Sequence, residues 1–575
     1  MTKKTILIIL SACIGLLIAV SAIGPYLDNP TVVQDDFRQT NFWFWQFWDS
    51  ELFQGDFFAK SFERGMGLAP IYIFIWKSII PNFFSDLIYA SKFYALALSL
   101  LGALAAYLLI SKISESKNSF FALSFVLSIS VVFWCTDHVS AAHIRSSVWL
   151  LLLLYLWLKS SKEDLWAGLF CLPALFFNPT AFILCMSAEG FSWLLNIRNK
   201  VLTKTFYIGI LNTFITVLNH FVLRSGVEYA GEGKALSYEQ MSSMPEFNPG
   251  GRSAIFGSKL WDGSWWTNEH WGFGYGYLEI SKLVFIALFC IIVYFIVCRP
   301  TFIKLKSLLM TAPAYLVYGS ISLYFLSQLV FPLLYFPSRY ISTSFILLSA
   351  LVSYLCLEQI IIRLFFKSDN GEIENMTRAE RRKIEKSKST RSSSSKKPVL
   401  LINIIYLMLG ISFWLYFKNF YHPRYVSINP KINHTLSLTP KDSLIAGHPL
   451  LPDLNVASIT SKRMVYVDFE RSLAFTMKAV EEIRRRHFRV FDLVYAKSKE
   501  EFESVAEAEG ITHVLALYDF YLPNYLTNPR YVNPYNEYLK EKVKLNEGES
   551  FYIADFLKDK QRRYGLIDVA NMGIK

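Results

Sequence analysis

The sequence predicts a mainly α protein: a polytopic transmembrane helical bundle of about eleven spans, followed by a C-terminal soluble α/β domain. Three observations support this fold class. Of the 575 residues, 53% are hydrophobic and only 18% are charged. Apolar runs long enough to cross a bilayer recur along most of the chain, and none follows residue 417. This composition excludes a nucleic-acid-binding protein, a disordered chain and a receptor with a single anchor.

Each predicted span is a run of roughly 20 mostly apolar residues, the length of helix that crosses about 30 Å of hydrocarbon. We expect the first run to remain as an anchor rather than to be removed as a signal peptide, because its apolar stretch is long. The segment 69–81 is too short to cross and is expected to be re-entrant or interfacial. The spans lie near residues 5–24, 86–110, 119–136, 146–158, 164–178, 180–195, 205–223, 281–298, 307–329, 340–365 and 399–417.

The distribution of Lys and Arg predicts the orientation of these spans. With a cytoplasmic N-terminus, every inner loop carries basic residues, as the positive-inside rule requires. Residues 363–397 alone hold eleven Lys or Arg against five Asp or Glu. All seven cysteines lie in or beside apolar runs and show no disulfide framework. We therefore expect a multi-pass protein of a bacterial plasma (inner) membrane, surrounded by membrane lipids and without a nucleic-acid partner.

The domain boundaries follow from these patterns. Residues 1–366 form the transmembrane core, and residues 28–85 are its long first outer loop. A basic cytoplasmic linker at 367–398 precedes the last transmembrane helix at 399–417. Residues 418–575 are then expected to form an extracytoplasmic α/β domain. Within it, segments 443–446, 463–468 and 513–517 are predicted strands, 473–494 and 499–509 are predicted helices, and Gly510 is expected to end the second helix.

Polar side chains that could serve in catalysis are concentrated in the first loop (residues 28–85). Asp35 and Asp36 lie just beyond the first span, with Arg38 shortly after them. Two adjacent carboxylates can serve as a general base and its neighbour, or as a cation site. They can equally cap the helix that follows and keep the loop solvated. A Gly-Asp-Phe turn at 55–57 and a Pro-Ile-Tyr segment at 70–72 lie further along the loop.

In this order of motifs the loop resembles the glycosyltransferase C superfamily, the polyprenol-phosphate-sugar-dependent membrane transferases that include protein O-mannosyltransferases and the lipid A aminoarabinose transferase. The resemblance covers residues 1 to about 110 at the level of motifs and 1–417 at the level of topology. It implies that Asp35 is the base that takes the acceptor's proton and that Asp36 lies close by. The chain departs from the pattern at 68–70, where Leu-Ala-Pro stands in place of the related Lys-Pro-Pro.

A sugar on a lipid phosphate already has a good leaving group, so such a protein needs a base and cations that stabilise the departing phosphate. Lys92 lies in the outer half of an apolar span. Its ammonium can bind the donor phosphate, or it can simply snorkel, which means that the long side chain carries the charge to the membrane surface. Pro-x-Arg-Tyr turns similar to the one around Arg339 occur in this superfamily. The candidates for binding the donor phosphate are Arg38, Lys92, Arg145 and Arg339, with Arg252 as a further cation.

Three other groups of polar residues have both a functional and a structural interpretation. Asp137, His138 and His143 are candidate ligands of a divalent metal ion, the one cofactor left open, or interfacial hydrogen-bonding residues. Glu189 lies inside a span, where a carboxylate is either functional or protonated and bonded between helices. Sugar or acceptor stacking and a membrane-interface belt are both consistent with the third group, which combines aromatic and polar side chains. Its members are Trp265, Trp266, Glu269 and His270.

The function expected from this sequence is transfer of a sugar from a polyprenyl-phosphate donor to an acceptor on the extracytoplasmic face. A transporter or flippase of a lipid-linked glycan or other hydrophobic solute is the alternative from a different class. Transporters are built from related halves with polar groups near mid-bilayer, and neither feature is evident in this sequence. A third alternative is a non-catalytic scaffold. The donor sugar, the acceptor and the oligomeric state cannot be assigned from the sequence.

Overall fold

The computed structural model is mostly helical. Its helices of bundle length coincide, among the described residues, with ten of the predicted spans. The predicted span at 205–223 is described only at 207–212, 214 and 215. The structure describes residues 2–66, 69–135, 139–161, 163–196, 207–212, 214, 215, 236–252, 278–298, 300, 311–329, 338–366, 396–420, 424–471, 476–545, 549–571, 573 and 574.

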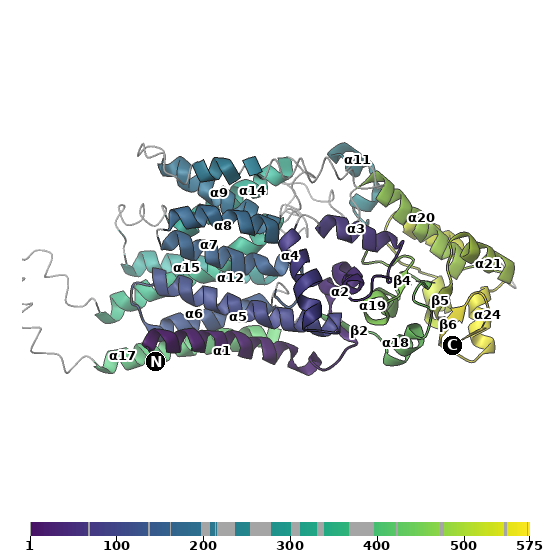
Figure 1. The fold of residues 1–575 in the computed structure, drawn as a ribbon, viewed down its shortest axis with the longest axis horizontal. Helices are drawn as coiled ribbons and strands as arrows, with labels where there is room; N and C mark the ends of the chain where they lie inside the picture. The colour runs from purple at the N-terminus through teal and green to yellow at the C-terminus, as the bar shows by residue number, and fades with distance from the viewer. Residues whose placement is uncertain are drawn as a thin grey trace, which may run out of the picture.

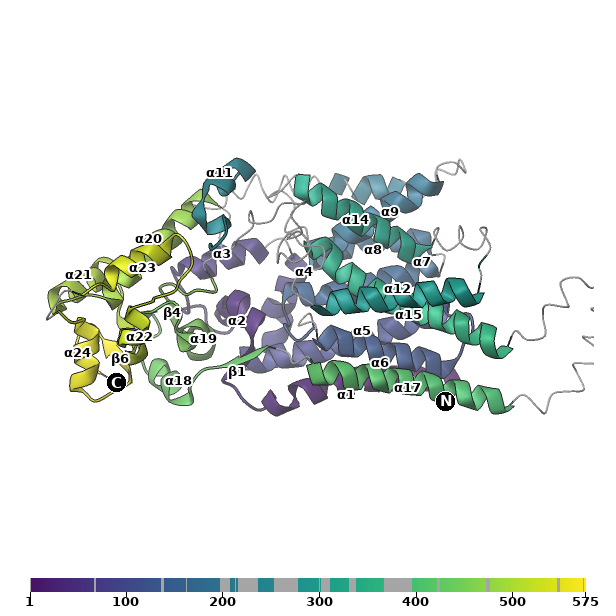
Figure 2. The ribbon, with the colours of Figure 1, turned by 180° about the vertical axis from the view of Figure 1, so that it is seen from behind.

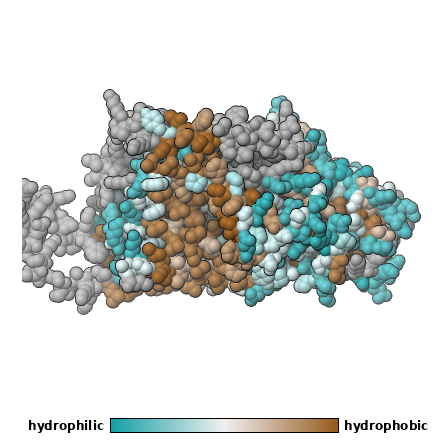
Figure 3. All heavy atoms as spheres, in the orientation of Figure 1, coloured by the Kyte–Doolittle hydropathy of each residue, from teal (hydrophilic) through white to brown (hydrophobic). Residues whose placement is uncertain are grey.

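These long helices lie side by side and form a bundle (Figure 1). Within the described chain, three segments are long and apolar enough to cross a membrane: Lys3–Tyr26, Leu87–Ile113 and Thr343–Leu364. Figure 3 shows a broad apolar surface over the bundle, flanked by hydrophilic surface on both sides. The apolar helices identify a membrane protein. The bundle helices are α1 (Lys3–Ile23), α5 (Leu87–Ile113), α6 (Ser119–Cys135), α7 (Val148–Ser160), α8 (Asp164–Phe177), α9 (Pro179–Asn196), α12 (Leu278–Cys298), α14 (Ala312–Leu329), α15 (Ser338–Phe366) and α17 (Lys396–Phe420).

Small residues bring the helices of the bundle close together. At the contact of α1 with α5, a Cβ on Gly15 would lie 2.7 Å from the Ala103 Cβ and 2.8 Å from the Ser99 carbonyl oxygen. Ser99 Oγ instead donates a hydrogen bond of 2.8 Å to the Gly15 carbonyl oxygen. Helices α1 and α17 both pack against α6, and Figure 2 shows all three along the same edge of the bundle. Packing of small residues is the usual means of helix association in membranes.

The charged groups inside the bundle have partners. Glu189 on α9 accepts hydrogen bonds from Tyr155 and Lys159 of α7, both at 2.9 Å. The Lys159 ammonium also lies 2.7 Å from Asp164 at the start of α8. Glu358 on α15 is fully buried and accepts from Ser114 Oγ and from the backbone N–H of Ser116. These contacts join neighbouring helices. Glu189 therefore has a structural role between helices, as the partner of the Lys159 ammonium and not as the isolated protonated carboxyl of the alternative given above.

Short elements of the first loop lie between the bundle and the C-terminal residues (Figure 1). The predicted interfacial segment 69–81 consists of α4 followed by one π-helical turn. One short α-helix and two 3-10 turns come from later loops: α11 (Tyr238–Ser243), η5 (Ile144–Ser147) and η7 (Pro245–Phe247). The first-loop elements are η1 (Gly24–Tyr26), β1 (Val32–Gln34), α2 (Asp35–Asn41), η2 (Phe42–Phe47), α3 (Phe57–Met66), α4 (Pro70–Phe74), η3 (Ile75–Ile79) and η4 (Ile80–Asn82).

The C-terminal part (residues 424–574) contains a five-stranded sheet with the order β4-β3-β5-β6-β7. Strands β3, β4 and β5 are parallel, and β6 and β7 are antiparallel additions. The strands are β2 (Tyr425–Ser427), β3 (Leu444–Gly447), β4 (Met464–Val465), β5 (His513–Leu517), β6 (Tyr564–Asp568) and β7 (Gly573–Ile574). The helices are α18 (Pro430–Ser437), α19 (Pro452–Ser461), α20 (Met477–Val494), α21 (Lys499–Ala508), η11 (Tyr518–Tyr521), α22 (Pro523–Leu526), α23 (Tyr535–Lys542) and α24 (Tyr552–Asp559).

Local sequence signals fix several of these elements. Strand β5 has the bounds predicted from its apolar run. Gly510 has φ +65 directly after α21, as expected of the residue that ends a helix. Strand β4 is shorter than the predicted 463–468, because the chain turns where an Asp468 oxygen accepts from the Arg471 backbone N–H at 2.8 Å.

The first loop and the C-terminal part are joined by backbone pairing. Strand β1 pairs antiparallel with β2, with Val33 opposite Val426. The tryptophans of the loop extend this contact into a buried core. Trp45 is 1% exposed and its Nε1 donates a hydrogen bond of 2.7 Å to the Ile459 carbonyl oxygen on α19. The C-terminal part is therefore packed directly on the loop that carries the candidate catalytic residues.

Candidate active site

The two adjacent carboxylates are held at the start of α2. The Gln34 side chain caps this helix by accepting from the Phe37 backbone N–H at 3.1 Å. The Asp35 backbone N–H donates to the Arg424 carbonyl oxygen at 2.9 Å, which continues the pairing of β1 with β2. Because a strand pairing fixes the chain immediately before α2, the C-terminal part determines where Asp35 and Asp36 lie.

Each of these carboxylates forms an ion pair with a different arginine. Arg38 Nη2 lies 2.5 Å from Asp35 Oδ1, and the two side chains are 6% and 20% exposed. Arg38 also donates from Nη1 to the Asn455 carbonyl oxygen at 3.0 Å. Asp36 pairs with Arg145, and these side chains are 30% and 27% exposed. The structure thus brings together four of the predicted site residues: Asp35, Asp36, Arg38 and Arg145.

The structure contains a third carboxylate–arginine pair, which the sequence analysis did not predict as a pair. Arg252 Nη2 lies 3.0 Å from Glu470 Oε2, with side-chain exposures of 26% and 25%. Burial raises the pKa of Glu470, and the nearby Asp35 adds to this effect, while the positive charges of Arg252 and Arg38 oppose it. Glu470 therefore lies within electrostatic reach of the pair formed by Asp35 and Arg38. The sequence signal that could have found Glu470 is its place just after a parallel strand, at the edge where such sheets carry their ligand sites.

Arg145 is positioned by a short capped turn. His143 begins η5, and its Nδ1 accepts from the Arg145 backbone N–H at 3.3 Å. The imidazole therefore has a structural role in placing Arg145. Among the residues that the structure describes, no group of three His, Cys, Asp or Glu side chains could hold a metal ion. Two of the candidate ligands, Asp137 and His138, lie outside those residues, so the metal site stays a prediction.

Lys92 is buried at the boundary between α5 and the first loop. Its Nζ donates to the carbonyl oxygens of Tyr26 and Asn29, both at 2.6 Å. These bonds hold the chain that leaves α1 against α5. Two of the three donors of the ammonium are used in this way, and the proposed contact of Lys92 with a donor phosphate stays a prediction.

The side chains of the remaining site candidates lie outside the described part of the structure. Arg339 is in the first turn of α15, and its proposed contact with a donor phosphate stays a prediction. The aromatic group in the loop of residues 224–280 falls within 253–277, which the structure does not describe. These four residues are Trp265, Trp266, Glu269 and His270.

The Gly-Asp-Phe turn of the first loop has a structural role. Gly55 adopts φ +80, a conformation that glycine reaches without strain. Asp56 is 4% exposed and its Oδ1 accepts from the Ala59 backbone N–H at 2.6 Å, which caps α3. Burial raises the pKa of Asp56. This carboxylate is committed to a helix end and is not available to a substrate.

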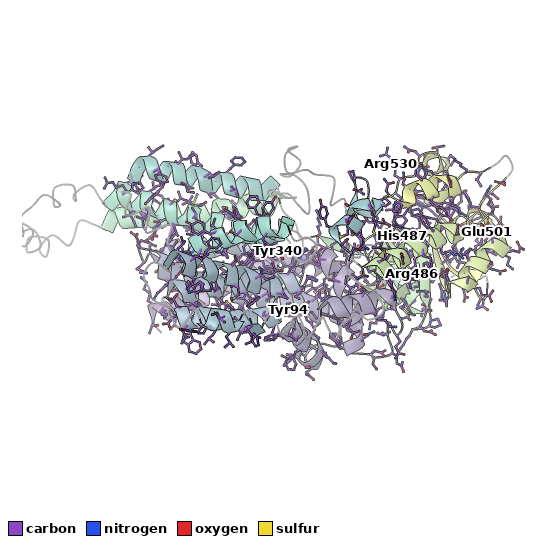
Figure 4. The ribbon with its side chains drawn as sticks, turned by 90° about the horizontal axis from the view of Figure 1, so that it is seen from above. Tyr94, Tyr340, Arg486, His487, Glu501 and Arg530 are labelled. Carbon is purple, nitrogen blue, oxygen red and sulfur yellow. The ribbon has the colours of Figure 1, made fainter. Side chains whose placement is uncertain are left out.

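An aromatic layer lies beneath the ion pairs. Tyr72 is fully buried; its hydroxyl accepts from Asn41 Nδ2 at 2.7 Å and donates to the Ala142 carbonyl oxygen at 3.0 Å. Trp76 packs against Phe37 with a centroid distance of 5.4 Å. Figure 4 shows Tyr94 at the end of the bundle, facing the side on which Arg486 and His487 of the C-terminal part lie. Because α2 rests on this layer, its side chains are held on a rigid support.

A buried ion pair holds the C-terminal part against the loop. Arg471 is 3% exposed, its Nη2 lies 2.5 Å from an Asp468 oxygen, and its Nη1 donates to Ser458 Oγ at 3.0 Å. The guanidinium also lies over the Phe42 ring, 4.5 Å from its centroid. A buried charge that is paired and hydrogen-bonded in this way fixes geometry, because breaking the pair would leave the other charge unsatisfied. Glu470 is next to Arg471 in the chain and is positioned by this anchor.

No family model matches this sequence, and no curated protein matches it. Among solved structures, the chain is similar to the Archaeoglobus fulgidus oligosaccharyltransferase in the apo form, with a TM-score of 0.45, 12% identity and coverage of 90% of this chain and 70% of that one. The same enzyme tethered with an acceptor peptide containing the NVT sequon matches with a TM-score of 0.27 and 12% identity, over 90% and 58%. The archaeal oligosaccharyltransferase AglB in complex with an inhibitory peptide and a dolichol-phosphate gives 0.28 and 12%, over 90% and 59%.

Proposed function

We propose that this chain is a membrane glycosyltransferase that moves a sugar from a polyprenyl-phosphate donor to an acceptor on the extracytoplasmic face. The observation that supports it best is the placement of the pairs Asp35 with Arg38 and Asp36 with Arg145. They lie where the apolar bundle meets the polar first loop and C-terminal part. At such a boundary a lipid tail stays in the bilayer while its phosphate reaches polar groups.

The reaction that these residues can support is a single displacement. The acceptor nucleophile attacks the anomeric carbon of the donor sugar, and the bond between that carbon and the phosphate oxygen breaks. The acceptor's proton passes to a carboxylate, Asp35 or Asp36, and the electron pair of the broken bond leaves with the lipid phosphate. A guanidinium can hold two phosphate oxygens at once, so Arg38 and Arg145 are suited to stabilise this leaving group.

The pairing of acid with arginine has a chemical consequence. Each arginine holds the carboxylate that it pairs with in a fixed position. When a donor phosphate then takes part of the guanidinium's hydrogen bonds, the carboxylate is released next to the reacting centre. Asp36 and Arg145 are more exposed than Asp35 and Arg38, so their pair is the easier one for a substrate to enter.

The experiment that tests this function uses the purified full chain with a set of polyprenyl-phosphate sugars. We expect release of free polyprenyl phosphate, detected by mass spectrometry, when an acceptor is supplied from the membrane fraction of the host. A transporter or flippase would leave the donor intact and only change the leaflet in which it lies. Donor that stays intact with every sugar tested, while it crosses the bilayer of proteoliposomes, would favour that second class.

A further inference from the structure

The pair formed by Arg252 and Glu470 joins two segments that are far apart in the sequence. Arg252 Nε donates to the Phe469 carbonyl oxygen at 3.1 Å, and the guanidinium lies 4.5 Å from the centroid of the Phe469 ring. Its Nη2 reaches Glu470 Oε2 at 3.0 Å. The guanidinium is thus oriented by a backbone carbonyl and a ring, independently of the carboxylate it pairs with.

The charges of Asp35 and Arg38, at the start of α2, act on Glu470, so these two groups lie within electrostatic reach of the pair. Within the part of the chain that the structure describes, Arg38 Nε and Gln34 Nε2 are buried and have no hydrogen-bond partner. Their side chains are 6% and 3% exposed. Buried N–H donors without partners are costly, and Arg38 Nε belongs to the guanidinium that pairs with Asp35.

The three pairs differ in how readily an external anion can enter them. Arg38 is nearly buried and is tied to the Asn455 carbonyl oxygen as well as to Asp35. Arg252 and Glu470 are each about a quarter exposed. An ion pair at such a partly exposed site is open to exchange with an anion from the solvent. A phosphate has the geometry and the charge to replace a carboxylate on a guanidinium.

We propose that Arg252 is a binding residue for a phosphate group and that Glu470 competes with this phosphate for the guanidinium. Glu470 then acts as an internal anion that keeps Arg252 oriented and lowers the affinity of the site for phosphate. The identity of the phosphate as that of a polyprenyl donor rests on the proposed function above. The competition itself rests on the contacts of Arg252 alone.

The test measures binding of farnesyl phosphate to the full chain in detergent, with farnesol as the uncharged lipid and inorganic phosphate as the lipid-free anion. Glu470→Gln should tighten farnesyl phosphate binding by about threefold to tenfold, because the competing charge is removed while the side-chain size is kept. Farnesol binding should not change. Arg252→Ala should weaken phosphate binding, and the double variant should show no gain over Arg252→Ala alone.

Glu246→Gln is the matched control. Glu246 also forms a carboxylate–arginine pair between the segment 236–252 and the C-terminal part, with Arg484 Nη2 at 2.7 Å, but its partner is not Arg252. A gain in affinity from Glu246→Gln equal to that from Glu470→Gln would overturn the proposal, because a general loosening of the segment would then explain both. Unchanged or weaker phosphate binding by Glu470→Gln would overturn it as well.

The remaining outcomes separate this inference from the proposed function. Tighter binding of farnesyl phosphate by Glu470→Gln supports the competition, whether or not inorganic phosphate also binds more tightly. The measurement with inorganic phosphate shows whether the lipid tail contributes to binding. If Glu470→Gln binds farnesyl phosphate more tightly but the protein releases no lipid phosphate from any donor, the phosphate site is supported and the proposed transferase activity is contradicted. If the protein transfers sugar but Glu470→Gln does not change the affinity, the transferase activity is supported and this role of Glu470 is contradicted.

Discussion

Asp35 and Asp36 are neighbours in the sequence, but their environments differ. Asp35 is held by Arg38, which is itself nearly buried, and also accepts from Gln39 at 3.3 Å. Asp36 faces Arg145 from another loop, and both of these side chains are about 30% exposed. Two carboxylates with different partners can take different roles, one as the base and the other in orientation.

The first prediction concerns these two carboxylates. Asp35→Asn should lower transfer by about 100-fold to 10,000-fold, the usual cost of losing a general base. The amide keeps the side-chain size and can still accept from Arg38, so the protein should remain folded. Asp36→Asn should cause a smaller loss, through the orientation of Arg145. The measurement is the initial rate of lipid phosphate release, with thermal unfolding in detergent as the test of folding.

Asp49→Asn is the control for this prediction. Asp49 is a carboxylate of the same loop, 2.7 Å from Lys441 of the C-terminal part and outside the candidate site. Its substitution should leave the rate of release unchanged. If both Asp35→Asn and Asp36→Asn retain the wild-type rate, the acidic pair only caps α2 and the proposed mechanism is wrong.

At the scale of elements, the sequence predicted the helices well because an apolar run of sufficient length has few alternatives in a membrane. It also located β5 and the glycine after α21 from local patterns. It did not predict the pairing of β1 with β2, because a three-residue strand has no clear signal and its partner lies almost 400 residues away. For the same reason it missed Glu470, whose role depends on contacts with Arg252 and with the first loop.

The contact between α1 and α5 gives the second prediction. Gly15→Val should separate the two helices, because a Cβ at this position would lie 2.7 Å from Ala103 Cβ and 2.8 Å from the Ser99 carbonyl oxygen. We expect a lower temperature of unfolding in detergent and a lower yield of folded protein. Gly190→Ala on α9 is the control, since no atom lies within 4 Å of a Cβ built there. Equal effects of the two substitutions would show that helix propensity, not packing, limits stability.

Two buried histidines of the C-terminal part have lowered pKa values. Burial, together with the charge of His487, lowers the pKa of His448 to about 3, and burial lowers the pKa of His487 to about 4. His448 Nδ1 accepts from the Leu450 backbone N–H at 3.2 Å, and its ring stacks on Phe520 with centroids 4.0 Å apart. Both imidazoles are neutral in the folded protein near pH 7.

The third prediction follows from this difference between the folded and unfolded states. The unfolded chain gains protons on these histidines below its ordinary pKa of about 6.5, whereas the folded chain does not until about pH 4 and then pH 3. The stability that the neutral histidines contribute is therefore complete above pH 6.5 and falls as the pH decreases through this window. Thermal unfolding of the full chain at a series of pH values should show the loss.

The variant His448→Asn isolates the contribution of one imidazole. Its Oδ1 can still accept from the Leu450 backbone N–H, but the side chain does not titrate. We expect lower stability at pH 7, from the lost stacking on Phe520, and a smaller decrease between pH 6.5 and pH 4. His434→Gln, at an exposed position of α18, should leave the pH dependence as in the wild type. A slope that His448→Asn does not change would assign the acid sensitivity to other groups.

For the whole molecule, the polar candidate site depends on the first loop and the C-terminal part lying on the same side of the membrane. The pairing of β1 with β2 and the hydrogen bond from Trp45 to Ile459 require this. A polar domain packed against that loop cannot lie on the other side of a bilayer. The sequence predicted the same arrangement independently, from the count of spans and the placement of Lys and Arg.

The fourth prediction tests this topology and, with it, the side on which the site faces. A cysteine introduced at Ser550 should react with a membrane-impermeant thiol reagent in intact cells, because residues 418–575 are expected to be extracytoplasmic. A cysteine at Ser394 should react only after the cells are permeabilised, since the basic segment 367–398 is expected to be cytoplasmic. Labelling is measured as a mass shift on gels, against a chain without introduced cysteines. If Ser394→Cys reacts in intact cells and Ser550→Cys does not, the orientation is reversed, and Asp35, Asp36 and their arginines face the cytoplasm, where the donor and acceptor must then be sought.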